Sequence, residues 1–254
     1  MQITEPTAGA PCWVELATAD PDAAKVYYRE VFGWRVETDP RPEAGGYTML
    51  SLGGAPVAAL TPLYAPGRPT AWTVSFGTRD ADASAAAATK AGGTLLMEPM
   101  DVFDLGRFAV LADPAGAVFA LWQARSFAGA AVFGAPGSLG WVELATPDPE
   151  GARTFYPRVF GWTVNTGDAY TQWGVEGADF GGMSLLDDRY PGDMPANWMP
   201  YFAVADVDAT AARAAEAGGT LLVPAMDVPD GPRVAMIRDP QGGVFGIHRA
   251  SAEG

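Results

Sequence analysis

Two glutamates occupy the same place in two copies of one motif. Glu15 follows Trp13 by two residues in the segment WVELAT, and Glu143 follows Trp141 by two residues in a second WVELAT. Because residues i and i+2 share a face of a β-strand, each carboxylate is expected to point the same way as an indole ring. A carboxylate among such rings has a raised pKa and suits a general base. Alternatively, each glutamate accepts hydrogen bonds from the backbone or an indole NH and fixes its strand.

The chain has one histidine, His248, and one cysteine, Cys12. His248 could act as an acid or base near neutral pH, or it could be a surface residue at the end of a strand. The catalytic candidates are therefore Glu15, Glu143 and His248. A single cysteine excludes an intrachain disulfide and a CxxC metal site, and it suits a reducing cytoplasm. A single histidine excludes a zinc site built from three histidines of one chain.

The charge of the chain excludes some partners. Among 254 residues there are 30 acidic and 16 basic side chains, which gives a net charge of -14. Such a chain repels phosphate backbones and anionic lipid heads, so neither nucleic acid nor a membrane is an expected partner. No apolar run approaches the roughly 18 residues of a spanning helix, and the first residues lack the features of a signal peptide. We expect a cytoplasmic protein whose partner is a small molecule.

The chain repeats itself. Residues 13–34 return as residues 141–162 with 14 identities in 22 positions, and residues 92–122 return as 218–248 with 16 identities in 31. Repeats of this kind indicate two homologous domains. The predicted division is an N-terminal domain over 1–125, a linker over 126–140 and a C-terminal domain over 141–254. Apolar residues in the linker indicate that it packs along a domain.

Each half contains two similar units of secondary structure. In the first unit a strand runs into Asp20-Pro21, which favours a helix start, and Gly33 favours its end. An alanine-rich helix ending at Gly92-Gly93 marks the second unit. Three strands are predicted after each helix, so the order is βαβββ twice per domain. The strands expected in the first half are 13–18, 34–38, 47–52, 56–61, 72–77, 94–97, 107–112 and 118–122.

Together these motifs resemble the vicinal oxygen chelate superfamily. They are the tandem βαβββ units, the helix ending in FGW, the second helix ending in AGG and the closing strand after DPxG. That superfamily includes glyoxalase I, extradiol dioxygenases and bleomycin and fosfomycin resistance proteins. The segment from WVELAT to FGW most resembles two-domain glyoxalase-like proteins that are often labelled hydroxylases. The resemblance implies an α+β fold, in which each pair of modules curls into a cup-shaped mixed sheet with helices outside.

Metal-dependent members of this superfamily hold a divalent ion on four strands of each cup. The resemblance places the four ligands at positions that carry no imidazole, amide or carboxylate here. These positions are Trp13, Ala58 or Ala59, Thr73 and Ala120 in the first half, and Trp141, Gly181 or Gly182, Met199 and Gly246 in the second. Ala120 and Gly246 cannot coordinate a metal, and no position carries the His, Gln or Glu that metal-dependent members use. We therefore expect no metal and no other cofactor.

Aromatic residues are frequent on the strands that the superfamily uses for cup walls. Flat indole walls suit a planar, largely apolar ligand, although sheet faces also need aromatic core. The predicted ligand-binding residues are Trp13, Trp72, Trp122, Trp141, Trp173, Trp198 and Tyr201. The loops 62–70 and 187–196 are the natural lids over the two cups.

Three functions remain open at this point. The first is a metal-independent protein that binds a small aromatic compound in a Trp-lined cup, as drug-binding resistance proteins do. The second is a metal-free tailoring enzyme, such as an isomerase, cyclase or hydroxylation partner, that uses Glu15, Glu143 or His248 as acid or base. The third is a scaffold whose cups are filled by its own side chains. A monomer with an internal pseudo-dimer, or a weak homodimer, is expected.

Overall fold

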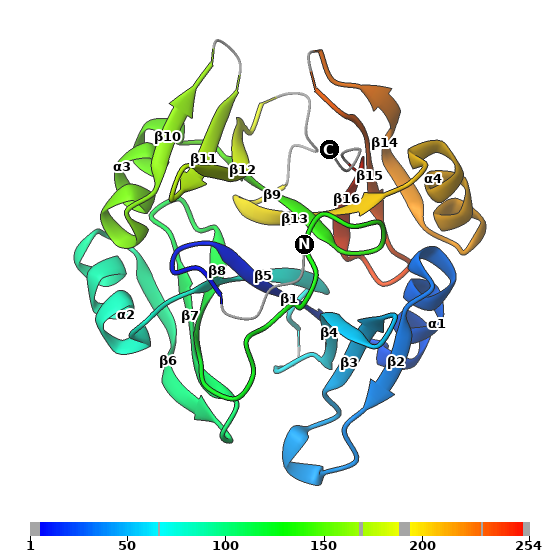
Figure 1. The fold of residues 1–254 in the computed structure, drawn as a ribbon, viewed down its shortest axis with the longest axis horizontal. Coiled ribbons are helices and arrows are strands. Elements are labelled where there is room, and N and C mark those ends of the chain that lie inside the picture. Colours follow the sequence, from blue (N-terminus) through cyan, green and yellow to red (C-terminus); the bar gives the residue numbers. More distant parts are fainter. Residues whose placement is uncertain (1–5, 66, 168–169, 188–193, 230, 251–254) are drawn as a thin grey trace.

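Two curved sheets built from the two halves of the chain form the fold, which is described here from a computed structural model (Figure 1). The structure describes residues 6–65, 67–167, 170–187, 194–229 and 231–250. Within these ranges, no helix has the length and apolar character needed to cross a membrane.

The N-terminal half forms one eight-stranded sheet with the order β2-β3-β4-β1-β5-β8-β7-β6. The strands β1 and β4 are parallel, whereas β1 and β5 are antiparallel and join the two βαβββ units at the centre. The elements are β1 (Pro11–Thr18), α1 (Pro21–Phe32), β2 (Arg35–Thr38), a 3-10 turn (Pro42–Ala44), β3 (Thr48–Leu52), β4 (Ala55–Pro62), β5 (Ala71–Gly77), α2 (Ala81–Lys90), β6 (Thr94–Val102), β7 (Gly106–Ala112) and β8 (Val118–Ala124).

The C-terminal half repeats this topology in the order β10-β11-β12-β9-β13-β16-β15-β14. The predicted α+β fold of tandem βαβββ units is therefore confirmed. The elements are β9 (Leu139–Thr146), α3 (Pro149–Phe160), β10 (Thr163–Thr166), β11 (Thr171–Val175), β12 (Ala178–Leu185), β13 (Asn197–Val204), α4 (Val207–Glu216), β14 (Thr220–Asp227), β15 (Arg233–Arg238) and β16 (Val244–Arg249).

The first helix begins and ends where its sequence indicates. The Asp20 carboxylate accepts a hydrogen bond from the Ala23 amide at 3.1 Å, and Pro21 opens the helix. Gly33 ends it in the left-handed region at φ 71°, which glycine adopts without steric cost. The third helix has the same ends, with an Asp148 cap and Gly161 at φ 72°.

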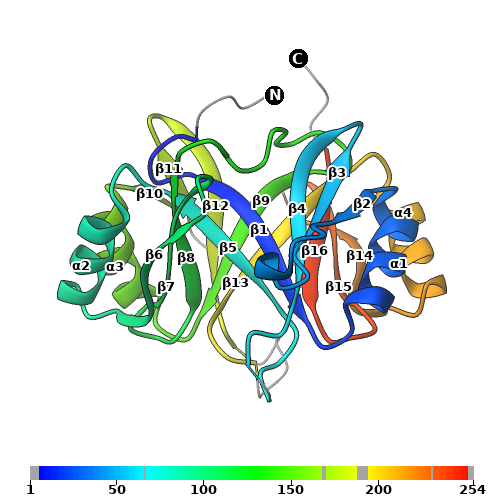
Figure 2. The ribbon, with the colours of Figure 1, turned by 90° about the horizontal axis from the view of Figure 1, so that it is seen from below.

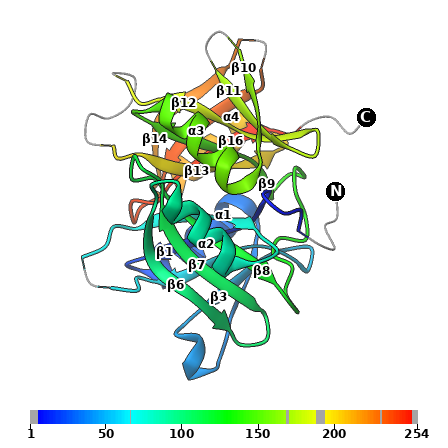
Figure 3. The same ribbon diagram turned by 90° about the vertical axis from the view of Figure 1, so that its left-hand side faces the viewer.

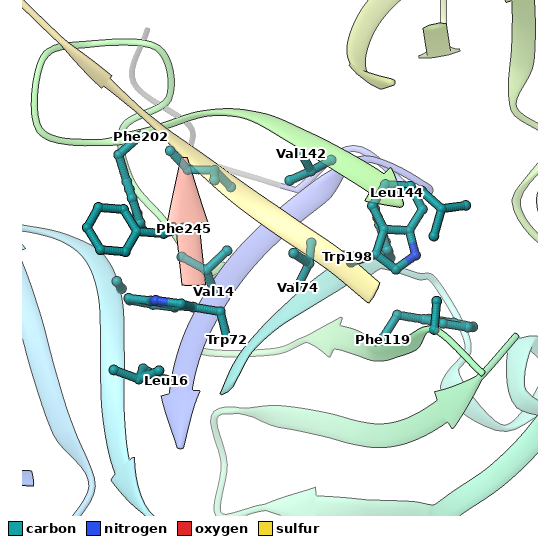
Figure 4. Close-up of a cluster of buried hydrophobic side chains, with 14 of the residues drawn as sticks. Val14, Leu16, Trp72, Val74, Phe119, Val142, Leu144, Trp198, Phe202 and Phe245 are labelled. Atoms are coloured by element: carbon teal, nitrogen blue, oxygen red, sulfur yellow. The ribbon is translucent and has the colours of Figure 1, made fainter. Parts of the chain in front are cut away.

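One face of each sheet packs into a core that both halves share. Alternate residues of the central strands, such as Val14 and Leu16, belong to this core, which also contains the side chains shown in Figure 4. The helices pack in pairs drawn from different halves, with α1 against α4 on one flank and α2 against α3 on the other (Figures 2 and 3). Neither half therefore buries its apolar surface alone, because each completes the core of the other.

Two reciprocal chains of hydrogen bonds cross this shared core. The Trp72 indole donates to the Tyr28 hydroxyl at 3.1 Å, and Tyr28 donates to Asp239 of the other half at 2.7 Å. In the opposite sense, the Tyr156 hydroxyl donates to Asp113 of the N-terminal half at 2.9 Å. Both aspartates also accept backbone NH groups of their own turns. The two halves are thus joined by polar contacts that are fully buried.

The segment between the halves packs along both of them. The Ala130 amide donates to the carbonyl of Cys12, and the Gly137 amide donates to the carbonyl of Ala203 in the second half, each at 2.8 Å. The Trp34 indole donates to the Gly137 carbonyl at 2.7 Å. Phe127 meets the ring of Trp13 edge to face at 5.0 Å. The segment therefore covers part of the N-terminal sheet.

We expect Tyr28→Phe to lower the free energy of unfolding by about 1–3 kcal/mol, because it leaves buried polar atoms of Asp239 and Trp72 without their partner. Urea denaturation followed by circular dichroism measures the change. Val26→Ala alters an exposed position of the same helix and should stay within about 0.5 kcal/mol of the wild type. Equal stability of Tyr28→Phe and the wild type would show that the hydrogen bonds across the core contribute little.

Candidate functional site

The second face of each sheet lies away from the shared core and carries the two glutamates. On β1, Trp13 and Glu15 alternate with Val14 and Leu16, and Trp13 belongs to a separate apolar cluster with Trp122 and Ala59. We call this side of the N-terminal sheet the first concave face, defined by Trp13, Glu15, Ala59, Thr73, Ala120 and Trp122. The second concave face, in the other half, is defined by Trp141, Glu143, Met199, Tyr201 and Met236.

Glu15 lies at the end of a directed chain of hydrogen bonds. The Trp13 indole donates to the Tyr47 hydroxyl at 3.0 Å, and Tyr47 in turn hydrogen-bonds to the Glu15 carboxylate. An indole NH can only donate, so the Tyr47 hydroxyl accepts from Trp13 and turns its own proton toward Glu15. A second hydroxyl, that of Tyr64 in the loop after β4, also donates to Glu15. The carboxylate therefore has two tyrosine donors.

Glu143 has the same arrangement in the other half. The Trp141 indole donates to Tyr170 at 3.0 Å, and the Tyr170 hydroxyl donates to Glu143 at 3.0 Å. Ser184 donates to the other carboxylate oxygen at 3.2 Å. The Trp-Tyr-Glu relay is thus duplicated, and both glutamates serve as hydrogen-bond acceptors on their strands.

Burial dominates the electrostatics of Glu15. Desolvation raises its pKa above the ordinary value, and the hydrogen bonds from Tyr64 and Tyr47 offset this rise only in part. The pKa of the Tyr47 hydroxyl is also raised, first by burial and then by the nearby Glu15 charge. At neutral pH the tyrosine thus stays a proton donor to the carboxylate.

The four positions that carry metal ligands in related folds do not fit a metal here. On the first concave face they hold Trp13, Ala59, Thr73 and Ala120, and strand register places Ala59 and Thr73 on either side of Glu15. Across the described ranges of the chain, no three side chains of the His, Cys, Asp or Glu type gather in a group that could bind an ion. A lone carboxylate with no second ligating side chain does not make a divalent site.

In the second half, aromatic rings fill the space above two of the positions that carry a metal ligand in related folds. A Cβ atom at Gly246 would overlap with the ring of Tyr201, and a Cβ atom at Gly182 would overlap with the Tyr170 hydroxyl. Glycine at these positions leaves room for the aromatic rings. The rings therefore occupy the volume that a ligating side chain needs.

Three of the seven predicted ligand-binding aromatic residues lie in the shared core and are not on the concave faces with the other four. Trp72, Trp173 and Trp198 are buried among residues of both halves, on the far side of the sheets from Glu15 and Glu143. The Trp198 indole donates to Tyr156 at 2.8 Å within this core. Strand register explains the first case, because Thr73 lies opposite Glu15 and its neighbour Trp72 must then face the other way.

Four predicted aromatics lie on the concave faces. Trp13 and Trp122 are brought together on the first, where they contact Phe127 of the linker at 5.0 and 6.1 Å between ring centres. Trp141 and Tyr201 are brought together on the second. Trp13, Trp122 and Tyr201 are 6–8% exposed, so these faces are largely filled by their own side chains. Two surface hollows lie elsewhere, beside α2.

His248 takes no part in the Tyr170-Glu143 hydrogen bonds. Its ring packs against Gly140, and its Nδ1 lies 2.9 Å from the carbonyl oxygen of Arg249. Burial lowers its pKa, so the ring is neutral at pH 7. Its role as an acid or base stays a prediction.

Four polar residues of these sites do not follow from the strand pattern around the glutamates. They are Tyr47, Tyr64, Tyr170 and Ser184. The repeat contains a signal for two of them, because Tyr47-Thr48 and Tyr170-Thr171 stand at equivalent places before β3 and β11. Tyr64 of the predicted lid 62–70 contacts Glu15, and the role of this loop as a lid stays a prediction. The other predicted lid, 187–196, lies mostly outside the described residues.

Comparison with protein families agrees with this architecture. Residues 13–122 match the family described as glyoxalase-like domain, and residues 138–245 match the glyoxalase/bleomycin resistance protein/dioxygenase superfamily. The chain therefore belongs to the glyoxalase/bleomycin resistance protein/dioxygenase superfamily.

Relatives of similar length extend over nearly the whole chain. "Putative glyoxylase CFP32" of Mycobacterium tuberculosis is 39% identical over 248 residues, which cover 94% of each chain. "Anthracycline biosynthesis protein DnrV" of Streptomyces peucetius is 40% identical and covers 96% of this chain and 94% of its own length.

Solved structures share the fold at low sequence identity. The Mn(II)-bound glyoxalase from Novosphingobium aromaticivorans superposes with a TM-score of 0.67 at 19% identity, covering 97% of this chain and 83% of that one. The 2,3-dioxygenase LapB from Pseudomonas sp. KL28 also gives 0.67, at 12% identity, with coverage of 97% and 93%. These likenesses establish the fold alone.

We expect Glu15→Gln to change how stability depends on pH. Because the folded-state pKa of Glu15 is raised, its contribution to stability is present below the unfolded-state pKa and is lost as pH rises through the folded-state pKa. The free energy of unfolding of the wild type should therefore fall relative to Glu15→Gln as pH rises from about 4. Urea denaturation at a series of pH values measures this.

The matched control is Glu30→Gln, which removes one exposed carboxylate from α1. The free energy of unfolding of each variant is compared with that of the wild type at each pH. If the difference for Glu15→Gln changes with pH no more than the difference for Glu30→Gln, burial does not destabilise the ionised carboxylate of Glu15.

Proposed function

We propose that this chain binds a small, largely apolar aromatic compound on its first concave face, without a metal ion. Glu15, a half-buried hydrogen-bond acceptor with a raised pKa, shares one sheet face with the aromatic side chains of Trp13 and Trp122, and this combination supports the proposal. An acceptor beside flat apolar walls fits a planar compound that has a polar edge. Burial of such a ring contributes roughly 25 cal/mol per Å².

The name of one relative supports this class of ligand. The chain is 40% identical to an anthracycline biosynthesis protein along nearly its whole length, and anthracyclines are planar aromatic polyketides. A compound of that shape presents a broad apolar face to indole rings and oxygen substituents to a carboxylate. The net charge of -14 favours a neutral or cationic ligand over an anionic one.

Metal independence is the second part of the proposal. It rests on the side chains at the four ligand positions, none of which is an imidazole, an amide or a carboxylate, and on the rings of Tyr170 and Tyr201 above Gly182 and Gly246. Recognition then depends on apolar burial and on hydrogen bonds to the glutamates.

A tailoring enzyme is the second candidate, and the environment of Glu15 favours it. A carboxylate whose pKa is raised by burial is a stronger base than an exposed one, and the Trp13-Tyr47 relay holds it in one orientation. Such a group could remove a proton next to a carbonyl of an aromatic substrate in an isomerisation, a cyclisation or a step that assists hydroxylation. Glu143 would serve in the same way in the second half.

The first test is binding of 1,4-dihydroxyanthraquinone, followed by tryptophan fluorescence and by calorimetry in the presence of EDTA. We expect quenching with one site per chain. Trp122→Leu should weaken binding about tenfold, because it removes one aromatic wall. Trp141→Leu is the matched control, because it removes an indole from the second concave face and should leave the affinity unchanged.

Three outcomes would contradict the proposal. One is an affinity that disappears with EDTA, which would show that a metal takes part. Another is equal loss of binding in both tryptophan variants. The third is a lack of binding by either wild type or variants, which would favour a scaffold whose concave faces are closed by their own side chains.

The enzyme candidate has a separate test. We expect Glu15→Gln to abolish conversion of an aromatic ketone substrate, followed by proton-deuterium exchange at the carbon next to its carbonyl, while the fluorescence quenching persists. Exchange that continues at the wild-type rate in Glu15→Gln and in Glu143→Gln would exclude both glutamates as the base.

A further inference from the structure

Tyr64 is an exposed loop residue whose hydroxyl contacts the first concave face. The residue is 65% exposed, yet its hydroxyl reaches inward and donates to the carboxylate of the half-buried Glu15. Burial of this hydroxyl end and the Glu15 charge raise the pKa of Tyr64. The ring thus stands in solvent while the phenolic oxygen fills a desolvated acceptor site.

The backbone around Tyr64 is attached at both ends of its loop. The Leu63 amide donates to the Thr18 carbonyl at 3.2 Å, and the Thr70 hydroxyl accepts the Ala19 amide at 3.3 Å. These anchors belong to the end of β1 and do not involve the Tyr64 side chain. Rotation of this exposed side chain therefore leaves the anchors of the loop in place.

The two tyrosines on Glu15 differ in how firmly they are held. Tyr47 accepts the Trp13 indole NH and packs against the apolar cluster of the first concave face. Tyr64 takes part in no aromatic ring pair among those found in the described ranges. Tyr47 is thus held by the Trp13 indole and the apolar cluster, whereas the ring of Tyr64 stands in solvent.

A carboxylate that loses a donor in a desolvated site pays a large penalty unless another donor takes its place. Whatever displaces Tyr64 must therefore offer an OH or NH group to Glu15. The group now in place is a phenol on an aromatic ring, so the site already displays the chemistry that it accepts. The hydroxyl of a hydroxyarene matches it in size, polarity and neutral charge.

We propose that Tyr64 holds the place of the ligand's phenolic hydroxyl, so that the bound compound is a hydroxylated arene that displaces Tyr64 from Glu15. This inference rests on the proposed function, because it assumes an aromatic ligand on the first concave face. It adds the substituent that is recognised, the residue that recognises it and the side chain that leaves.

Calorimetry at pH 7 with three naphthalenes tests the recognised group. The probes are 2-naphthol, 2-methoxynaphthalene, which cannot donate, and 2-(aminomethyl)naphthalene, which is cationic. We expect the wild type to bind the naphthol at least tenfold more tightly than the ether, because a hydrogen bond to a charged acceptor is worth more than one to a neutral acceptor. Glu15→Gln should reduce this preference to about threefold or less, since the charge is removed and the size is kept.

Displacement has its own variant. Tyr64→Phe removes the hydroxyl that every ligand must displace, so both naphthol and ether should bind about tenfold more tightly while their ratio stays the same. Tyr47→Phe is the matched control: it removes a hydroxyl from the same carboxylate, but one that stays in the bound state, and it should tighten neither ligand.

The outcomes separate this inference from the proposed function. Binding of naphthalenes without preference for the hydroxyl, preference for the amine, or weaker binding in Tyr64→Phe would overturn the inference and leave the aromatic site standing. Weaker binding in Tyr64→Phe would mean that Tyr64 closes over the ligand instead of leaving. No binding of any probe by the wild type or by Tyr64→Phe would overturn the proposed function itself.

Discussion

The contact between the two sheets decides which side chains are left for a site. One face of each sheet is buried in the shared core. On the first sheet, the core includes Val14, Leu16 and Trp72. Because side chains alternate along a strand, the residues between them must lie on the other face. Trp13 and Glu15 are there for this reason. The core across the two halves therefore sets both the stability of the fold and the composition of its concave faces.

The same series of hydrogen bonds, from Trp to Tyr to a carboxylate, occurs both in the core and on the first concave face. In the core, an indole NH and a tyrosine hydroxyl lead to a carboxylate of the opposite half, as in Trp72-Tyr28-Asp239. On the first concave face the same order of groups ends at Glu15, next to an exposed loop. The hydrogen bonds in the core join the two halves through aspartates that also fix turns. The hydrogen bonds on the first concave face end at Glu15, from which we propose that the ligand displaces Tyr64, and that difference makes Glu15 the centre of the proposed site.

Local patterns predicted much of this fold, because they depend on neighbours along the chain. The repeat, the helix caps at Asp20 and Gly33 and the shared face of Trp13 and Glu15 all arise from local spacing. Strand register is different, because it depends on pairing between distant segments. The predicted place of Thr73 on the concave face already required Trp72 to face the core, yet the aromatic pattern alone suggested a wall. Contacts across a loop were also beyond local reach, since Tyr64 is 49 residues from Glu15.

We propose that the first concave face receives the hydroxylated ring of a small aromatic compound at Glu15. A crystal structure of the chain with 1,4-dihydroxyanthraquinone tests it most directly. We expect the ring system to lie against Trp13 and Trp122, a ligand hydroxyl to lie within hydrogen-bond distance of the Glu15 carboxylate, and Tyr64 to be rotated into solvent. A ligand bound elsewhere, or a first concave face that stays closed with Tyr64 still on Glu15 at saturating ligand, would contradict it.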